Sequence, residues 1–278
     1  MRGTTDPAAI GDEESGLSDI TRIPELGEAA LTAALSDYLA ITAADDADPY
    51  LAAKRALQTS GVELVRSYAK VRAALLPGQR VLDWGCRHAA LSWLARAELG
   101  EQIELHGCDV CAPDDYAAFH ARCGLRYMRL THAWQLPYPD AHFDAVLAGG
   151  TLEHVPNDGE SLSELWRVLK PGGALLITHL PNAASWTEFV SRRRFPAQAH
   201  ARRYALQSFR QRLLHHGFET VAAGHHQLMP SSLPAAWRRP WLSRLVDAVQ
   251  PLNVLESVWA FRRFSATLWL VARRREGF

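Results

Sequence analysis

The chain has no apolar run near the roughly 20 residues that span a membrane. Its first residues, Met1 to Gly16, are polar and partly acidic, and no basic stretch precedes an apolar core there. We therefore expect no secretory signal. Four cysteines in 278 residues are too few for a disulfide scaffold. These absences predict a cytoplasmic protein without a transmembrane segment.

Metal-ligand patterns are also scarce. Cys108 and Cys111 have the spacing of a metal-binding pair, and Cys86 and Cys123 are candidates for two further ligands. A second CxxC or a paired histidine motif is missing, however. We expect ordinary buried thiols and no metal site.

Charge is balanced over the whole chain but not along it. Residues 1–189 hold 15 basic and 26 acidic side chains, whereas residues 190–278 hold 15 basic and four acidic ones. A basic C-terminal third can meet an anionic substrate, a membrane surface or nucleic acid, or it can simply balance the acidic half. Peripheral membrane contact therefore stays open.

The pattern of apolar residues divides the chain into three parts. Residues 1–20 have no period and are predicted to be disordered, residues 21–78 to form helices, and residues 79–278 to form an α/β domain. Short apolar strands alternate with helices after Gly78, and we expect them at 80–83, 102–108, 125–130, 143–148, 174–179, 218–223 and 266–272. This alternation is typical of a doubly wound, mostly parallel, Rossmann-like seven-stranded sheet, with the last two strands antiparallel at one edge. A tryptophan-, proline- and arginine-rich stretch at about 226–263 interrupts it as a helical insert.

Two expected strands end in carboxylates. Asp83 and Gly85 close the first strand, and Asp109 closes the second. Ligands of open α/β sheets lie at the carboxyl ends of the strands, where an acid can accept hydrogen bonds from ribose hydroxyls. A glycine permits a sharp turn close to the ligand. The spacing predicts nucleoside binding. The Gly-x-Gly-x-x-Gly loop of nicotinamide-dependent oxidoreductases is absent.

A set of motifs resembles the class I S-adenosylmethionine-dependent methyltransferases, in their Leu-Glu-His-Val type. The set comprises Val81-Leu82-Asp83-Trp84-Gly85-Cys86, Leu136-Pro137-Tyr138-Pro139-Asp140, Phe143-Asp144-Ala145-Val146, Leu152-Glu153-His154-Val155-Pro156, Arg167-Val168-Leu169-Lys170-Pro171-Gly172-Gly173 and His215-His216-Gly217-Phe218. It covers residues 80–223 in order. The family works on small molecules such as glycans, lipids and secondary metabolites. A nucleic-acid substrate is not expected, because the Asn-Pro-Pro-Tyr motif of base methylases is missing.

The resemblance implies a set of cofactor contacts for S-adenosylmethionine. Asp83, Trp84, Gly85 and Cys86 would lie at its methionine part, and Asp109 would bind its ribose. The further positions implied are Tyr68, Val110, His132, Ala133, Trp134, Ala148 and Gly149. Two glycines of the family's loop are replaced here by Arg87 and Ala89. Side chains at these positions disfavour a positive φ.

Candidates for catalysis and substrate contact follow the fourth and fifth strands. His154 is the candidate general base, and Glu153, His179 and Asn182 are the candidate substrate contacts. The hypothesis is methyl transfer to an O, N or C atom of a small molecule, and the basic C-terminal third leaves an anionic acceptor open. The alternative is a non-catalytic binding or scaffold subunit with the same fold. The sequence gives no oligomeric state.

Overall fold

The computed structural model describes residues 26–42, 59–231, 237 and 239–277. One seven-stranded sheet has the order β3-β2-β1-β4-β5-β7-β6. Its strands are β1 (Arg80–Trp84), β2 (Glu104–Asp109), β3 (Arg126–Arg129), β4 (Phe143–Gly149), β5 (Leu169–Pro181), β6 (Phe218–His226) and β7 (Thr267–Arg274). The first five pair in parallel, and β7 pairs antiparallel with β5 and β6. The Rossmann-like, mostly parallel sheet is therefore confirmed.

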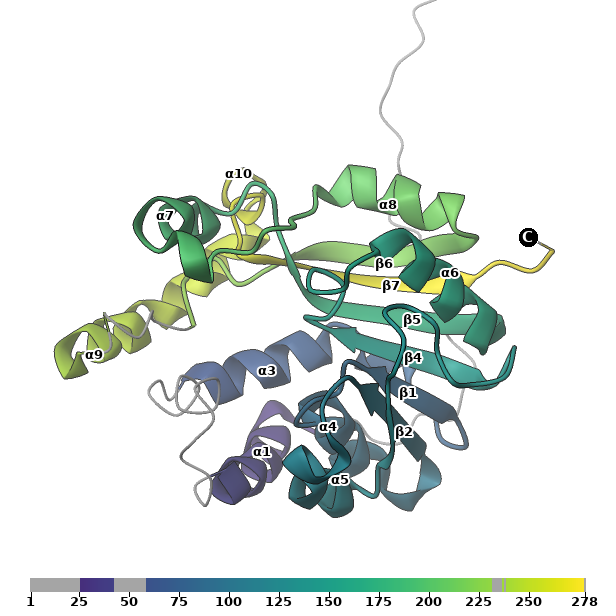
Figure 1. Ribbon diagram of the computed structural model, residues 1–278. Helices are drawn as coiled ribbons and strands as arrows, with labels where there is room; N and C mark the ends of the chain where they lie inside the picture. Colours follow the sequence, from purple (N-terminus) through teal and green to yellow (C-terminus); the bar gives the residue numbers. More distant parts are fainter. Residues whose placement is uncertain (1–25, 43–58, 232–236, 238, 278) are drawn as a thin grey trace, which may run out of the picture.

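Helices cover both faces of this sheet (Figure 1). One layer holds α1 (Glu28–Thr42), α3 (Thr59–Ala69), α4 (Ala90–Leu99) and α5 (Ala117–Cys123), and the other holds α6 (Asp158–Val168) and α8 (Leu206–His215). Successive strand residues point to opposite faces. Val81 and Leu147 accordingly belong to the core beneath the first layer, and Leu82 and Val146 to the core beneath the second.

The insert lies at the edge where the parallel strands end. Its described helices are α9 (Pro240–Val249), the 3-10 segment η6 (Gln250–Ser257) and α10 (Trp259–Arg262), with α7 (Trp186–Arg194) beside them (Figure 1). Because β7 runs antiparallel, its first residue, Thr267, pairs with both Pro181 and His226, the last residues of β5 and β6. At the base of the insert the amide of Ala266 donates to the carbonyl of Gln227 over 2.7 Å.

Two elements differ from expectation. The sequence pattern did not predict α7, whose N-terminus is capped by Ser185 Oγ accepting from the Glu188 amide. Strand β5 begins at Leu169 rather than at residue 174, and its register with β4 shifts between Phe143 and Ala145. Residues 171–173 are therefore an irregular part of the strand.

The predicted domain division stays a prediction. Residues 1–20, expected to be disordered, lie outside the described residues. Within the described part, every helix is too short or too polar to cross a membrane.

Candidate active site

The carboxyl ends of β1, β2, β4 and β5 meet at one edge of the sheet. The chain order reverses between β1 and β4, which are neighbours in the sheet although β2 and β3 intervene in the sequence. Such a switch point is where open α/β sheets bind ligands. The predicted cofactor loop, Asp109, Gly149 and the Glu153–His154 pair all follow these strand ends.

The loop after β1 keeps a left-handed backbone without its usual glycines. Gly85, Arg87 and Ala89 have φ of 70°, 40° and 55°. The left-handed conformation costs a residue with a Cβ about 1–2 kcal/mol, so Arg87 and Ala89 are strained positions. The Gly85 amide donates to the Cys108 carbonyl over 2.8 Å, which fixes the loop against β2. The loop conformation thus survives both substitutions.

The side chain of Arg87 is held along the loop after β2. Its Nε donates to the Tyr116 hydroxyl over 3.0 Å, and its guanidinium lies 5.8 Å from the centre of that ring. The imidazole of His120 donates to the Arg87 carbonyl over 2.7 Å. Both contacts fix the orientation of this residue beside Asp109.

Asp109 connects the loop after β1 with the loop after β2. Its Oδ2 accepts from the Arg87 amide over 3.0 Å and its Oδ1 from the Val110 amide over 2.6 Å. Cys111 Sγ also donates to Oδ1, over 3.5 Å. Each carboxylate oxygen has two acceptor sites, so one site on Oδ2 remains for a ribose hydroxyl. The side chains of Val110 and Trp134 are 64% and 38% exposed, and these apolar groups could flank an adenine. The residues present therefore fit a nucleoside cofactor.

His132 is already engaged with its own turn. Its Nδ1 accepts from the amides of Trp134 and Gln135 over 3.4 and 3.1 Å. A neutral imidazole that accepts at Nδ1 carries its proton on Nε2. The exposed nitrogen therefore donates, which suits an acceptor nitrogen of a base rather than an exocyclic amino group. Ala133 is exposed beside it.

Asp83 lies beneath the loop rather than on its surface. It is 4% exposed, and Ser92 Oγ donates to its Oδ2 over 2.7 Å. Burial raises the pKa of Asp83 to about 6, although the hydrogen bond from Ser92 opposes this shift. Trp84 and Cys86 are also buried. The side chains of Asp83, Trp84 and Cys86 thus pack in the interior and support the loop after β1.

Close packing requires glycine at both strand ends, and at Gly85 the left-handed backbone favours it as well. A Cβ on Gly85 would lie 2.3 Å from Thr151 Cγ2, and one on Gly149 would lie 2.6 Å from Leu91 Cδ1. Ala148, next to Gly149, is buried in the core. The glycines allow β1, α4 and the segment after β4 to approach closely.

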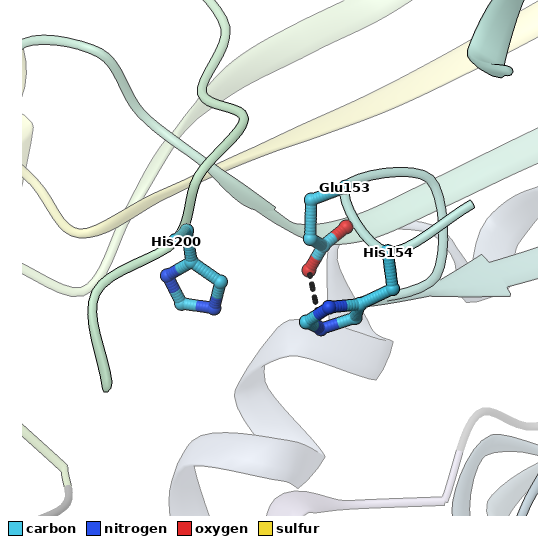
Figure 2. Close-up of side chains that lie close together, drawn as sticks. All are labelled: Glu153, His154 and His200. Carbon is cyan, nitrogen blue, oxygen red and sulfur yellow. Dashed lines mark ion pairs between the residues drawn. The ribbon is translucent and has the colours of Figure 1, made fainter. Parts of the chain in front are cut away.

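Glu153 and His154 follow β4 and meet His200, which precedes α8 (Figure 2). Glu153 is buried, and burial raises the pKa of its carboxyl to about 7. His154 is exposed, and partial desolvation, with His200 and Arg87 nearby, lowers its pKa. The hydrogen bond from His200 to Glu188 raises the pKa of His200. The candidate base His154 thus favours its neutral form near neutral pH.

The other predicted contacts have partners within the protein. His179 Nε2 lies 3.0 Å from Glu63 Oε1 on α3. The Asn182 amide nitrogen donates to the carbonyls of Arg263 and Ser265, each over 2.8 Å, so this residue supports the insert. Tyr68 is fully buried.

The hydroxyl of Tyr68 donates to Glu98 Oε2 on α4 over 2.6 Å. Its polar end therefore takes part in helix packing. Its closure over a cofactor stays a prediction, as do the substrate contacts of His179 and Asn182.

The sequence analysis missed His200 and Glu188. Both lie in a stretch without an apolar period, and His200 is 46 positions after His154 in the chain. The one local signal is Glu188 near the start of α7, where an acid is favourable. The four cysteines are free, and Cys86, Cys108 and Cys123 are buried, as expected for ordinary thiols.

Comparison with known proteins adds a domain assignment. Residues 82–177 match the family described as a methyltransferase domain. A 2-phytyl-1,4-naphtoquinone methyltransferase of Synechococcus elongatus is 35% identical over 129 residues, which cover 42% of this chain and 53% of the relative. A demethylmenaquinone methyltransferase of Listeria monocytogenes is 34% identical over 117 residues, covering 40% and 49%. The chain thus matches about half the length of these curated relatives.

A solved structure extends the likeness in fold. The Burkholderia thailandensis 1,6-didemethyltoxoflavin-N1-methyltransferase, with bound 1,6-didemethyltoxoflavin and S-adenosylhomocysteine, superposes with a TM-score of 0.52 at 17% identity, covering 92% of this chain and 93% of that one. The chain therefore has the fold of this methyltransferase, and residues 82–177 match the methyltransferase domain family.

Proposed function

We propose that the protein transfers a methyl group from S-adenosylmethionine to a small molecule. The observation that carries this proposal is the joined loop pair at the switch point. There the left-handed turn after β1 donates its Arg87 amide to Asp109 at the end of β2. The domain match and the S-adenosylhomocysteine bound to a protein of the same fold support the cofactor.

Each part of the edge has a role in this proposal. Asp109 binds the ribose, Val110 and Trp134 flank the adenine, and the loop from Gly85 supports the methionine part. Bound S-adenosylmethionine supplies a methyl group on a sulfonium, which is a good leaving group. The protein aligns the acceptor and excludes water, which is worth about 7–11 kcal/mol in favourable cases. His154, largely neutral, takes the proton of a hydroxyl acceptor.

The insert favours an acceptor from an apolar or anionic environment. Its exposed apolar side chains include Trp241, Val254 and Trp259, which are 63%, 70% and 70% exposed. Exposed arginines stand among the apolar side chains of α7 and the insert, at positions 192, 193, 194, 239, 244, 262 and 263. Aromatic and basic side chains together suit the interface of an anionic membrane. The quinone methyltransferases among the relatives agree with a lipid-soluble acceptor.

Cofactor titration tests the proposal first. Calorimetry with S-adenosylmethionine and S-adenosylhomocysteine should give micromolar binding that Asp109→Ala abolishes. The matched control, Asp114→Ala, changes an exposed acid a few residues further on and should bind normally. Absence of binding up to millimolar cofactor would instead favour the non-catalytic scaffold with this fold.

Membrane contact has a separate test. Sedimentation with phosphatidylglycerol vesicles should retain the protein at low salt, and pure phosphatidylcholine vesicles should not. A Trp241→Ala/Trp259→Ala variant should bind several-fold more weakly, whereas Leu214→Ala, exposed on α8, should not change. Equal recovery with both vesicle types would remove the membrane from the proposal.

A further inference from the structure

A buried acid and two histidines meet at the edge of the candidate active site. Glu153 and His154 are consecutive residues after β4, and His200 comes from the segment before α8 (Figure 2). One potential ligand atom from each residue lies within 4.8 Å of the others. Glu153 Oε1 is 3.8 Å from His154 Nε2. Two histidines and a carboxylate are a common ligand set for divalent transition metals.

The carboxylate of Glu153 lacks a partner for one of its oxygens. Its side chain is 3% exposed, and its Oε2 is buried without a hydrogen-bond partner. Buried carboxylate oxygens are normally paired, because desolvation of an unpaired one is costly. A cation beside this carboxylate would meet that requirement.

His200 is held in the manner of a metal ligand. Its Nδ1 lies 2.6 Å from Glu188 Oε1, and its amide donates to Glu188 Oε2 over 3.3 Å. A carboxylate at one ring nitrogen fixes the tautomer of a ligating histidine and leaves the other nitrogen for the metal. Glu188 is itself fixed at the start of α7, where its amide donates to Ser185 Oγ over 3.1 Å.

The two ligand-bearing segments are fastened to each other. Arg202 donates to the carbonyls of Leu152, Val155 and Pro156 over 3.1, 2.7 and 3.2 Å. The Tyr204 hydroxyl donates to the Leu152 carbonyl over 3.2 Å. These bonds surround Glu153 and His154 in the chain, so the distance between the two segments is set before any ion binds. Preorganisation of this kind raises metal affinity.

We propose that Glu153, His154 and His200 bind a divalent transition-metal ion of the Zn²⁺ type, with Glu188 as the positioning residue for His200. Tetrahedral Zn²⁺ with ligands at about 2.0–2.2 Å needs ligand atoms about 3.4 Å apart, which a rotation of the exposed His154 can provide. Three protein ligands leave one coordination position for an exogenous oxygen. The expectation of no metal site rested on the cysteines, which lack a second CxxC or paired histidine motif. No local motif joins Glu153 and His154 to His200 in the sequence.

The binding of the ion does not depend on the proposed methyl transfer, but its role does rest on that function. A metal here would bind an acceptor oxygen at the carboxyl edge and lower its pKa. His154 would then be a ligand, so in the metal-bound protein it is water, and not His154, that would take the proton of the acidified acceptor.

Calorimetry with Zn²⁺ on protein stripped with a chelator tests the proposal without cofactor. We expect one Zn²⁺ per chain and a Co²⁺ derivative with visible d–d absorption. His154→Ala and His200→Ala should weaken Zn²⁺ binding at least 100-fold, and Glu188→Gln by about 10–100-fold. His215→Ala, an exposed histidine on α8, is the matched control and should bind as the wild type does.

Thermal unfolding separates binding from misfolding. Zn²⁺ should raise the melting temperature of the wild type and of His215→Ala, but not that of His154→Ala. His154 is exposed, so its removal leaves the fold intact even if His200→Ala fails to fold. The absence of saturable binding at millimolar Zn²⁺, or unchanged affinity in His154→Ala, overturns the proposal. Zn²⁺ binding without S-adenosylmethionine binding would instead refute the proposed function and leave the metal site standing.

Discussion

Replacement of Asp83 by Asn should remove a loss of stability that the wild type shows as the pH rises from about 4 to about 6. The pKa of this buried carboxyl rises from 3.8 to about 6 in the folded chain, and burial is the main cause. An acid with a raised folded pKa stabilises the fold fully below its unfolded pKa. That stability is lost as the pH rises through the folded pKa. Asn is nearly isosteric and can still accept from Ser92, but it does not titrate.

The size of the effect follows from the shift. At about 1.36 kcal/mol per pKa unit, the wild type should lose about 1.6 kcal/mol relative to Asp83→Asn by pH 5 and about 3 kcal/mol by pH 7. Urea unfolding of both proteins between pH 3 and pH 8 measures this difference. Two parallel curves, with a constant difference across the range, would refute the reasoning. Ser92→Ala removes a hydrogen bond that lowers this pKa, so the transition should move to higher pH.

Two substitutions test the supports of the site. Gly85→Ala should cost more stability than Gly100→Ala by about 2 kcal/mol in urea unfolding, because both glycines have a positive φ but only the first would place a Cβ against Thr151. Equal costs would show that this contact relaxes. Asp158→Asn weakens buried hydrogen bonds beside the Glu153–His154 loop and should lower the free energy of unfolding by about 2 kcal/mol. Asp140→Asn, which weakens only an exposed ion pair, should lower it by less than about 1 kcal/mol. The reverse order in thermal melts would contradict the assigned roles.

Local patterns were sufficient for the sheet. All seven predicted strands form, and Asp83 and Asp109 lie at or next to the last residue of β1 and β2. Strand β3, which reads Arg-Tyr-Met-Arg, is not an apolar run. The antiparallel last pair followed from the long connection between the strands. Short-range signals of this kind are carried by the residues themselves, so no tertiary knowledge was needed.

Local sequence patterns did not predict the contacts between segments that are distant in the chain. Helix α7 is polar and basic, and its stability comes from the Ser185 cap and from the Trp186 indole donating to the Leu228 carbonyl. His200 reaches Glu153 through the hydrogen bonds of Arg202, which no periodicity encodes. Asn182 looked like a substrate contact because it follows a strand. In the structure its amide nitrogen donates to backbone carbonyls 81 and 83 positions later in the chain, and its contact with substrate stays a prediction.

The hydrogen bond between Gln227 and Ala266 brings the two ends of the insert together, so the insert could be exchanged as one unit if the Asn182 bonds to Arg263 and Ser265 are kept. Both of its ends leave the sheet from adjacent positions, bridged by one backbone hydrogen bond, so a shorter connection that keeps Arg263 and Ser265 could replace the segment between them. Sheet registers, and the loops that meet Asp109, would stay in place. If the proposed function holds, grafting this segment alone would test whether the insert determines the choice of methyl acceptor, because Asp109 lies outside it.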